Sequence, residues 1–378
     1  MGPNAKKVKG HEETQMDRLS DLPDSLIHHI LSLMDTKFAV QTCILSKRWV
    51  SLWTHLPAFN FDSKYFTRVD NMKRFVSHVL DRCNTINVLA LSIHTRRGKL
   101  EQGLFDRIIS FVLSHSVQEL RLSFVRLGTL QVSPTLFRCQ SLRVLKLTGY
   151  NYGFPRPLDF ATLKSLSLCR VGLRDNNYSN IFSSCINLQS LVLNSVYLVV
   201  ARVLKITAPA LVNLTVSDLT IFAARDDRHR ASPSLNENKL VISAPRLTSF
   251  NFNFPCYKPL SLSMVNSPFL DKVNFSILHF CDMDYQGGRL FPFLIKILRK
   301  FGNTRSLTVS SDVVRILSKH SRLLEDRSSP FTNLESLEVV RGGKSCKTIP
   351  LPVLNFFLHS SPFAEELQAK FKKGKKQA

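Results

Sequence analysis

A short leucine motif recurs along most of this chain of 378 residues and constrains its fold more than any other feature. The motif is a leucine, two residues, a second leucine, one residue and a third apolar residue. The clearest copies begin at Leu142, Leu163 and Leu188, and copies with other apolar residues begin at Leu211, Leu247, Leu270 and Leu334. Weaker copies surround Leu89, Leu120 and Leu307, which makes about ten predicted repeats in all.

The spacing of these copies identifies the kind of repeat. From Leu142 to Leu211 successive copies start 21, 25 and 23 residues apart, within the roughly 20–29 residues of leucine-rich repeats. In "VLKLT" Leu145 and Leu147 should point inward, because side chains alternate along a strand. One strand cannot bury that face alone, whereas stacked strands bury it together. The pattern predicts an α/β fold, an irregular leucine-rich-repeat solenoid of horseshoe shape over residues 84–345.

The repeats depart from the regular pattern in their turns and lengths. Three positions after the last leucine, where Asn or Cys is usual, the chain has Tyr150, Val171, Val196 and Leu219. The interval from Leu211 to Leu247 is 36 residues and contains a polar stretch near 224–239. We expect that stretch to be an inserted loop.

The outward positions of the predicted strands are mostly small and polar. Six of them are candidates for contact with a partner protein: Lys146, Ser167, Thr215, Asn251, Asn274 and Thr308. Charges nearly cancel on this face, so the formal net charge of +23 should lie on connections, the convex side and the tails. This distribution argues against a nucleic-acid groove along the strands.

Residues 17–60 have a different, helical character. Pro23 and Asp24 suit a helix start, a second helix is expected over about 36–44, and Ser46 can cap a third that carries Trp49 and Trp53. Three such short helices bury too little surface to be stable alone. We therefore expect this unit to pack on the rest of the chain or on another protein, with a linker helix over 61–83.

The segment "LSDLPDSLIHHILSLMDTKFAVQTCILSKRWVSLWTHLP" resembles the F-box motif, above all that of the plant F-box/leucine-rich-repeat family. The matching residues are Leu22, Pro23, Ile27, Ile30, Leu31, Ser32, Val40, Leu45, Ser46, Lys47, Arg48, Trp49, Leu52 and Trp53. The repeats resemble the same family more loosely, including the prolines that precede three strands, Pro209, Pro245 and Pro268. Together the resemblance covers most of the chain.

In that family the F-box docks on a Skp-type adaptor, which joins it to a cullin, and the repeats present a client protein for ubiquitin transfer. The resemblance implies this role and assigns adaptor contacts by position to Leu22, Pro23, Ile30, Leu31, Val40, Leu45, Ser46 and Trp49. Trp49 and Trp53 lie four residues apart. We expect Trp49 to face the adaptor, and Leu52 and Trp53 to pack the helical unit itself. The six outward strand positions become candidate client contacts.

No catalytic centre, cofactor or metal site is expected. "RGGKS" at Arg341–Ser345 lacks the first glycine of a phosphate loop, and "DMDYQG" from Asp282 lacks the twelfth-position carboxylate of a calcium loop. Two other readings stay open at this point: a basic repeat scaffold that binds nucleic acid or phosphate without a ligase role, and a repeat protein with a degenerate F-box.

The terminal segments and the cysteines indicate the cellular compartment. The eight cysteines form no CxxC pair, and no apolar run reaches the ~20 residues of a membrane span. With no secretory signal, these features predict the nucleus and/or cytoplasm, and "KKVK" at Lys6–Lys9 is a candidate import signal. We expect a disordered basic N-terminus over 1–16, a C-terminal cap over 346–367 with a short helix at 353–359, and a disordered basic tail over 368–378.

Overall fold

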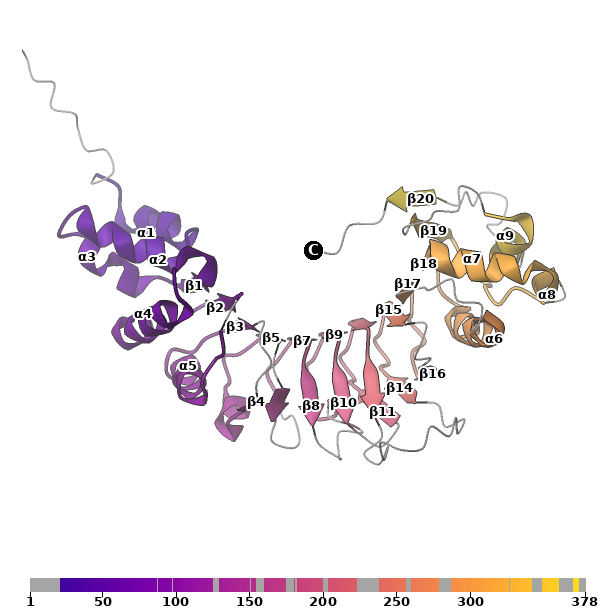
Figure 1. Ribbon diagram of the computed structural model, residues 1–378, viewed down its shortest axis with the longest axis horizontal. Helices are drawn as coiled ribbons and strands as arrows, with labels where there is room; N and C mark the ends of the chain where they lie inside the picture. The colour runs from indigo at the N-terminus through magenta and orange to yellow at the C-terminus, as the bar shows by residue number, and fades with distance from the viewer. Residues whose placement is uncertain are drawn as a thin grey trace, which may run out of the picture.

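In the computed structural model the elements follow one another in chain order along an arc (Figure 1). Short helices occupy the N-terminal end of the arc and further helices occupy the C-terminal end. The structure describes residues 21–86, 88–96, 98–124, 129–149, 151–153, 160–174, 180, 182–199, 203–222, 238–255, 260–278, 287–325, 327–341, 349–359 and 370–373. The predicted N-terminal segment 1–16, the import signal and nearly all of the insertion near 224–239 lie outside these residues.

The middle of the arc consists of parallel strands in three open sheets. The twelve-stranded sheet contains, in spatial order, β1 (Ala58–Asp62), β2 (Ala90–Thr95), β3 (Glu119–Phe124), β5 (Val144–Thr148), β7 (Ser165–Cys169), β9 (Ser190–Asn194), β12 (Asn213–Ser217), β15 (Ser249–Pro255), β17 (Lys272–Leu278), β18 (Ser306–Ser310), β19 (Ser336–Arg341) and β20 (Lys370–Lys373). A five-stranded sheet contains β13 (Thr220–Phe222), β10 (Tyr197–Val199), β8 (Gly172–Arg174), β6 (Asn151–Gly153) and β4 (Thr129–Gln131). A three-stranded sheet contains β11 (Val203–Thr207), β14 (Lys239–Ser243) and β16 (Ser261–Val265).

The helices lie mainly at the two ends. The N-terminal ones are α1 (Asp24–Ser32), α2 (Thr36–Gln41), η1 (Thr42–Ile44), α3 (Trp49–Leu52), η2 (Trp53–His55), η3 (Ser63–Tyr65), α4 (Val69–Arg82), α5 (Gln102–Ser114) and η4 (Pro134–Arg138). The C-terminal ones are α6 (Gly287–Leu298), η7 (Arg299–Phe301), α7 (Ser311–Lys319), α8 (Ser321–Glu325) and α9 (Leu351–Leu358). Of the helices described, none has the length and apolar character needed to cross a membrane.

The core lies behind the twelve-stranded sheet and is built from the leucines of the motif. Leu145 and Leu147 are buried, as predicted, and the register places Leu145 beside Leu120 and Leu166 on the neighbouring strands. In β15 and β17 phenylalanines replace the leucines, and the rings of Phe252 and Phe275 stack 6.0 Å apart. Figure 1 shows the two smaller sheets on the outer, convex side of the arc. The strand positions that point away from the core of the large sheet therefore face the inner, concave side of the arc.

The chain leaves the large sheet through residues in the left-handed conformation, directly after β5, β7, β9 and β12. These residues are Gly149 (φ 91°), Arg170 (φ 53°), Ser195 (φ 50°) and Asp218 (φ 52°). Each amide donates to a carbonyl of the next strand, as from Arg170 to Asn194 (2.8 Å) and from Ser195 to Ser217 (2.8 Å). Backbone hydrogen bonds therefore stabilise these turns without the expected Asn or Cys side chains.

The large sheet begins earlier than predicted, and the helix assigned as a linker lies within the array. β1 pairs in parallel with β2, and α4 is the crossover between them. Phe59 and Phe61 are buried on one face of β1, where phenylalanine takes the place of the motif leucines. The predicted boundaries at residues 60 and 84 thus divide one continuous unit, and the helical N-terminus shares the core of the sheet.

At the C-terminus α9 begins after Pro350, two residues ahead of the predicted cap helix. Within the tail predicted to be disordered, Lys370–Lys373 form the edge strand β20, paired with β19. The backbone register places Glu338 opposite Lys370 and Arg341 opposite Lys373. The remainder of that tail lies outside the described residues.

Candidate functional site

The first helix, α1, has one broad apolar stripe whose two edges differ in burial. Ile27 and Leu31 are buried against the rest of the N-terminal unit. Leu26 and Ile30, four residues apart, are exposed and share the other edge of the stripe. An amphipathic helix normally packs its apolar stripe against other parts of a protein, so the exposed part of the stripe on α1 is a candidate contact surface.

More apolar side chains are exposed on the elements that pack against α1. We call the full set the apolar face: Leu26, Ile30, Leu33, Met34, Ile44, Leu45 and Val50. Two of them lie in α1, Leu33 and Met34 directly follow it, and the other three belong to the segment η1–α3. Helix α1 contacts α3, which in turn contacts η1. Such a concentration of exposed large apolar residues within 25 positions is typical of a protein interface.

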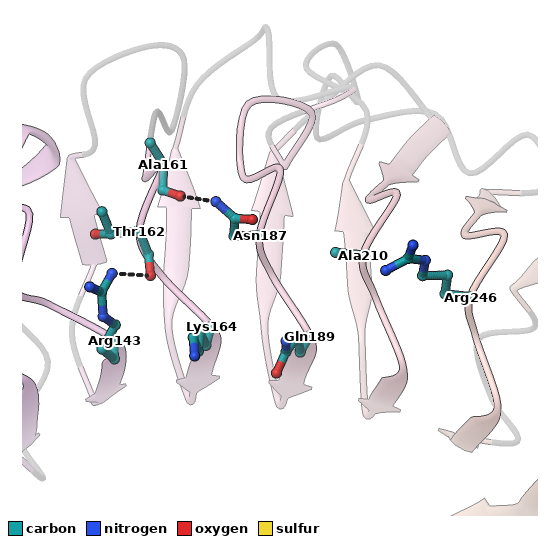
Figure 2. Close-up of a pocket in the computed structure, with 8 residues that line it drawn as sticks. All are labelled: Arg143, Ala161, Thr162, Lys164, Asn187, Gln189, Ala210 and Arg246. Carbon is teal, nitrogen blue, oxygen red and sulfur yellow. Dashed lines mark hydrogen bonds between the residues drawn. The ribbon is translucent and has the colours of Figure 1, made fainter.

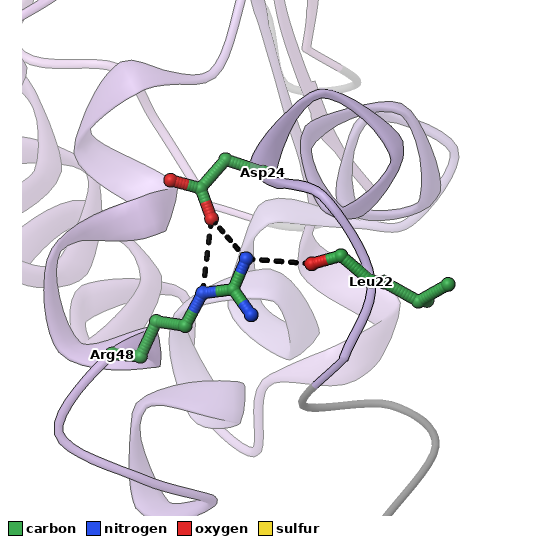
Figure 3. A network of polar contacts seen from close by, with 3 residues as sticks. All are labelled: Leu22, Asp24 and Arg48. Carbon is green, nitrogen blue, oxygen red and sulfur yellow. Dashed lines mark hydrogen bonds and ion pairs between the residues drawn. The ribbon is translucent and has the colours of Figure 1, made fainter.

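Arg48 holds the start of α1 against the segment that leads into α3 (Figure 3). Its guanidinium donates to the carbonyl oxygen of Leu22 (2.6 Å) and to a carboxylate oxygen of Asp24 (3.0 Å). Leu22 and Pro23 therefore have fixed positions beside the apolar face although they precede the first helical turn. The sequence had indicated Arg48 only as part of the motif, without this role.

Asp35 joins the helical unit to the large sheet. Its carboxylate accepts hydrogen bonds from the amide of Lys37 (2.9 Å), which caps α2, and from the amide of Asp62 in β1 (2.9 Å). The neighbouring Thr36 hydroxyl accepts from the amide of Asn60 (2.8 Å). Burial raises the pKa of Asp35, and the two backbone hydrogen bonds oppose that rise. The buried carboxyl thus makes the orientation of the apolar face depend on the first strand.

The positions inferred for adaptor contact divide into exposed and buried residues. Pro23, Ile30, Leu45 and Ser46 are exposed, whereas Leu22 and Val40 are partly buried against the core. Leu31 and Trp49 are only 1% and 4% exposed, so their assignment as surface contacts needs correction. Trp53, at the start of η2, is buried as expected, but so is Trp49, at the start of α3, and both rings join the core.

The residues missed by the inference from sequence are the most exposed ones. Ile44 lies at the end of η1 and Leu33 at the end of α1, and neither belongs to the motif match. The apolar residues of α1 form one stripe of ordinary width, so the sequence alone did not show which part of it is exposed. For Ile44 the signal in the sequence was its position directly before Leu45, a residue of the motif match.

The six client candidates lie in one row across the inner side of the arc. The register pairs Lys146 with Ser167, Thr215 with Asn251, Asn251 with Asn274, and Asn274 with Thr308. Val192 of β9 completes the row between Ser167 and Thr215. Residues from seven neighbouring strands thus form a continuous, mostly polar and uncharged strip, which suits hydrogen bonding to a partner.

The N-terminal end of this row carries a small charged cluster. Glu119 pairs with Arg121 (2.6 Å) and with Lys146 (3.5 Å), and Arg121 lies beside Lys146 in the register. Burial opposes ionisation of Glu119, but the two cations hold its pKa below the usual range. Lys146 is therefore already engaged, and a partner that contacts it must compete with Glu119. In the described part of the chain no cluster of His, Cys, Asp and Glu is suited to a metal ion.

Comparisons with known proteins match two parts of the chain to known families. The F-box domain family matches residues 19–60, and the LRR repeats of an FBD-associated F-box protein match residues 105–250. An F-box/FBD/LRR-repeat protein of Arabidopsis thaliana is 32% identical over 253 residues, 63% of this chain and 53% of that relative. A putative FBD-associated F-box protein of the same plant is 27% identical over 361 residues, 93% of this chain and 73% of that relative. The chain thus spans about half of the first relative and about three quarters of the second.

Proposed function

Because the chain belongs to the plant F-box/leucine-rich-repeat family, we propose that it is the substrate-recognition subunit of a Skp–cullin–F-box ubiquitin ligase. Helices α1, α2 and α3 serve as the three helices of the F-box and bind a Skp-type adaptor, which joins them to a cullin. The strand array serves as an irregular leucine-rich-repeat horseshoe that binds a client protein. The chain positions the client, and other subunits supply the chemistry of ubiquitin transfer.

The observation that carries the proposal is the apolar face. Large exposed apolar side chains concentrate on α1 and η1–α3, in the part of the chain that matches the F-box domain. Covering them with a partner removes apolar surface from water, at roughly 25 cal/mol per Å². Arg48 and Asp35 fix the helices that present this surface, so little ordering is needed on binding.

The row from Lys146 to Thr308 is the proposed client surface. Its groups are mainly amides and hydroxyls, which discriminate between partners through directional hydrogen bonds rather than through net charge. The row follows the strand order, so an extended client segment can cross several repeats. Replacing Asn251 and Asn274 with alanine should weaken client capture and leave adaptor binding unchanged.

The direct test is affinity purification of the complete chain from plant cells after the proteasome is blocked, with mass spectrometry of what accompanies it. The proposal expects a Skp-type adaptor and a cullin, together with one or more clients that are lost with the Asn251→Ala/Asn274→Ala variant. A folded chain that brings down neither adaptor nor cullin would remove the proposal. The proposal includes a nuclear and/or cytoplasmic location, which a fluorescent fusion tests.

The formal net charge of +23 favours a second candidate function, a basic scaffold for nucleic acid or phosphate without a ligase role. Such binding weakens steeply as salt rises, because it releases counterions. Absence of measurable nucleic-acid binding at about 50 mM salt, where the electrostatic attraction is strong, would dismiss this candidate.

A further inference from the structure

A groove runs along the edge of the large sheet at which its strands begin (Figure 2). Its volume is about 370 Å³. Arg143, Lys164 and Gln189, which line it, are the residues immediately before β5, β7 and β9. Their backbones continue the parallel ladder, with the amide of Lys164 donating to Arg143 (2.8 Å) and that of Gln189 to Lys164 (2.9 Å). The floor of the groove is therefore as rigid as the sheet.

The groove is positively charged. Arg143, Lys164 and Arg246 line it, and among the described residues no aspartate or glutamate does. Within the described residues none of these three cations forms an ion pair, whereas elsewhere Lys73 and Arg107 pair with carboxylates at 2.9 and 2.6 Å. A concave surface with charges of one sign attracts ligands of the opposite sign.

Two side chains of the groove are held by the backbone of the neighbouring turn. The guanidinium of Arg143 donates to the carbonyl oxygen of Thr162 (3.2 Å), and the amide of Asn187 donates to that of Ala161 (2.6 Å). These bonds cross between successive turns of the chain, as Figure 2 shows. The remaining guanidinium donors of Arg143 stay available to a ligand.

The spacing of the cations selects an extended ligand. Arg143 and Lys164 belong to adjacent strands, and Arg246, which leads into β15, lies three strands beyond Lys164 in the sheet order. With strands about 4.8 Å apart, the three charges extend over about 19 Å. A single phosphate contacts only one end of such a row, whereas about six residues of extended peptide, at ~3.3 Å each, cover it.

The chemistry of the lining favours peptide over nucleic acid. Single-stranded nucleic acid normally stacks its bases on aromatic rings, and none of the described residues that line this groove is aromatic. The exposed amide of Gln189 instead suits a peptide backbone. We propose that this groove docks an extended acidic segment of a protein, about six residues long, with carboxylates that reach Arg143, Lys164 and Arg246. The inference rests on the proposed function only in assigning that segment to the client.

The test measures binding of a fluorescent hexaglutamate peptide to the complete chain in complex with its adaptor, by anisotropy at about 50 mM salt, where charge interactions are weakly screened. The variant Arg143→Gln/Lys164→Gln/Arg246→Gln should bind about tenfold more weakly, the combined loss of three exposed ion pairs. The matched control is Lys205→Gln/Lys239→Gln/Lys300→Gln, which removes the same charge from exposed positions on β11, β14 and η7. The control should bind as the unaltered chain does.

Several results would overturn the inference. Equal weakening in the two triple variants would show attraction to net charge alone. A triglutamate that binds as tightly as the hexaglutamate would indicate a site for a compact anion. Oligothymidylate that binds more tightly than the peptide, and is lost with the groove variant, would show a nucleic-acid site. If the chain fails to bind any adaptor, the peptide is titrated against the chain alone, and groove-dependent binding then supports this inference while the proposed function fails.

Discussion

The double substitution Ile44→Ser/Leu45→Ser tests the apolar face most directly. Ile44 is 85% exposed and Leu45 is 58% exposed, so both can be changed with little effect on the core. Full burial of such side chains is worth roughly 1.5–3 kcal/mol each. Scaled by the exposed fractions, adaptor binding loses about 1.3–2.6 kcal/mol from Ile44 and about 0.9–1.7 kcal/mol from Leu45.

The two contributions together amount to about 2–4 kcal/mol, which corresponds to a rise of roughly 30- to 700-fold in the Kd for the adaptor. Calorimetric titration of a Skp-type adaptor into the purified chain measures this value. The matched control is Ile186→Ser/Phe269→Ser, which removes similar residues that are 55% and 67% exposed but lie in the repeats. A Kd within about threefold of the unaltered chain for Ile44→Ser/Leu45→Ser, with an unchanged Tm, would refute the assignment of the apolar face to the adaptor.

Three further predictions concern the scaffold. Gly149→Ala should lower the free energy of unfolding by about 3 kcal/mol or more in denaturant titrations, because a Cβ there would lie 1.5 Å from the carbonyl oxygen of Phe124 and the backbone is left-handed. The control Gly103→Ala, with open space around it in α5, should instead raise the free energy of unfolding by about 0.5–1 kcal/mol. Similar effects of the two substitutions would contradict the turn geometry. Trp49→Ala and Trp53→Ala should each cost about 3–5 kcal/mol in the same assay, since both rings are buried; a Trp49 variant of normal stability would show that its ring is at the surface. Because the pKa of Asp35 is raised above its ordinary value of 3.8, the folded chain holds its proton longer than the unfolded chain. The stability of the unaltered chain relative to Asp35→Asn should therefore fall as pH rises just above that value, and a rising difference would reverse the assigned direction.

The sequence predicted the strand array well because its signal repeats. In "VLKLT" the alternation that buries Leu145 and Leu147 recurs on each neighbouring strand, so errors at single positions do not change the inference. The left-handed turns were not predictable in the same way, because Arg170 and Ser195 are ordinary residues with no preference for that conformation. In these turns the hydrogen bond to the next strand sets the backbone conformation.

The N-terminal surface was harder to predict because helix faces must be assigned in three dimensions. The motif identified the right segment, but Trp49 in α3 and Trp53 in η2 are both buried, while Ile44 outside the matching residues is exposed. β1 was missed because phenylalanines replace the leucines, and its partner β2 is separated from it by the whole of α4. Pairing at that distance leaves no local signal.

The parallel stacking of the large sheet sets the distance between the N-terminal helices and each position on the inner surface. Each repeat advances the inner surface by one strand spacing of about 4.8 Å. Between β5 and β18 the sheet order has six such steps, so a contact at Thr308 lies about 29 Å farther along the arc from the N-terminal helices than one at Lys146. Gain or loss of a whole repeat would change the distance between the apolar face and the client surface by about 4.8 Å. Because each repeat contacts only its neighbours, repeats elsewhere in the array would keep their contacts and their stability.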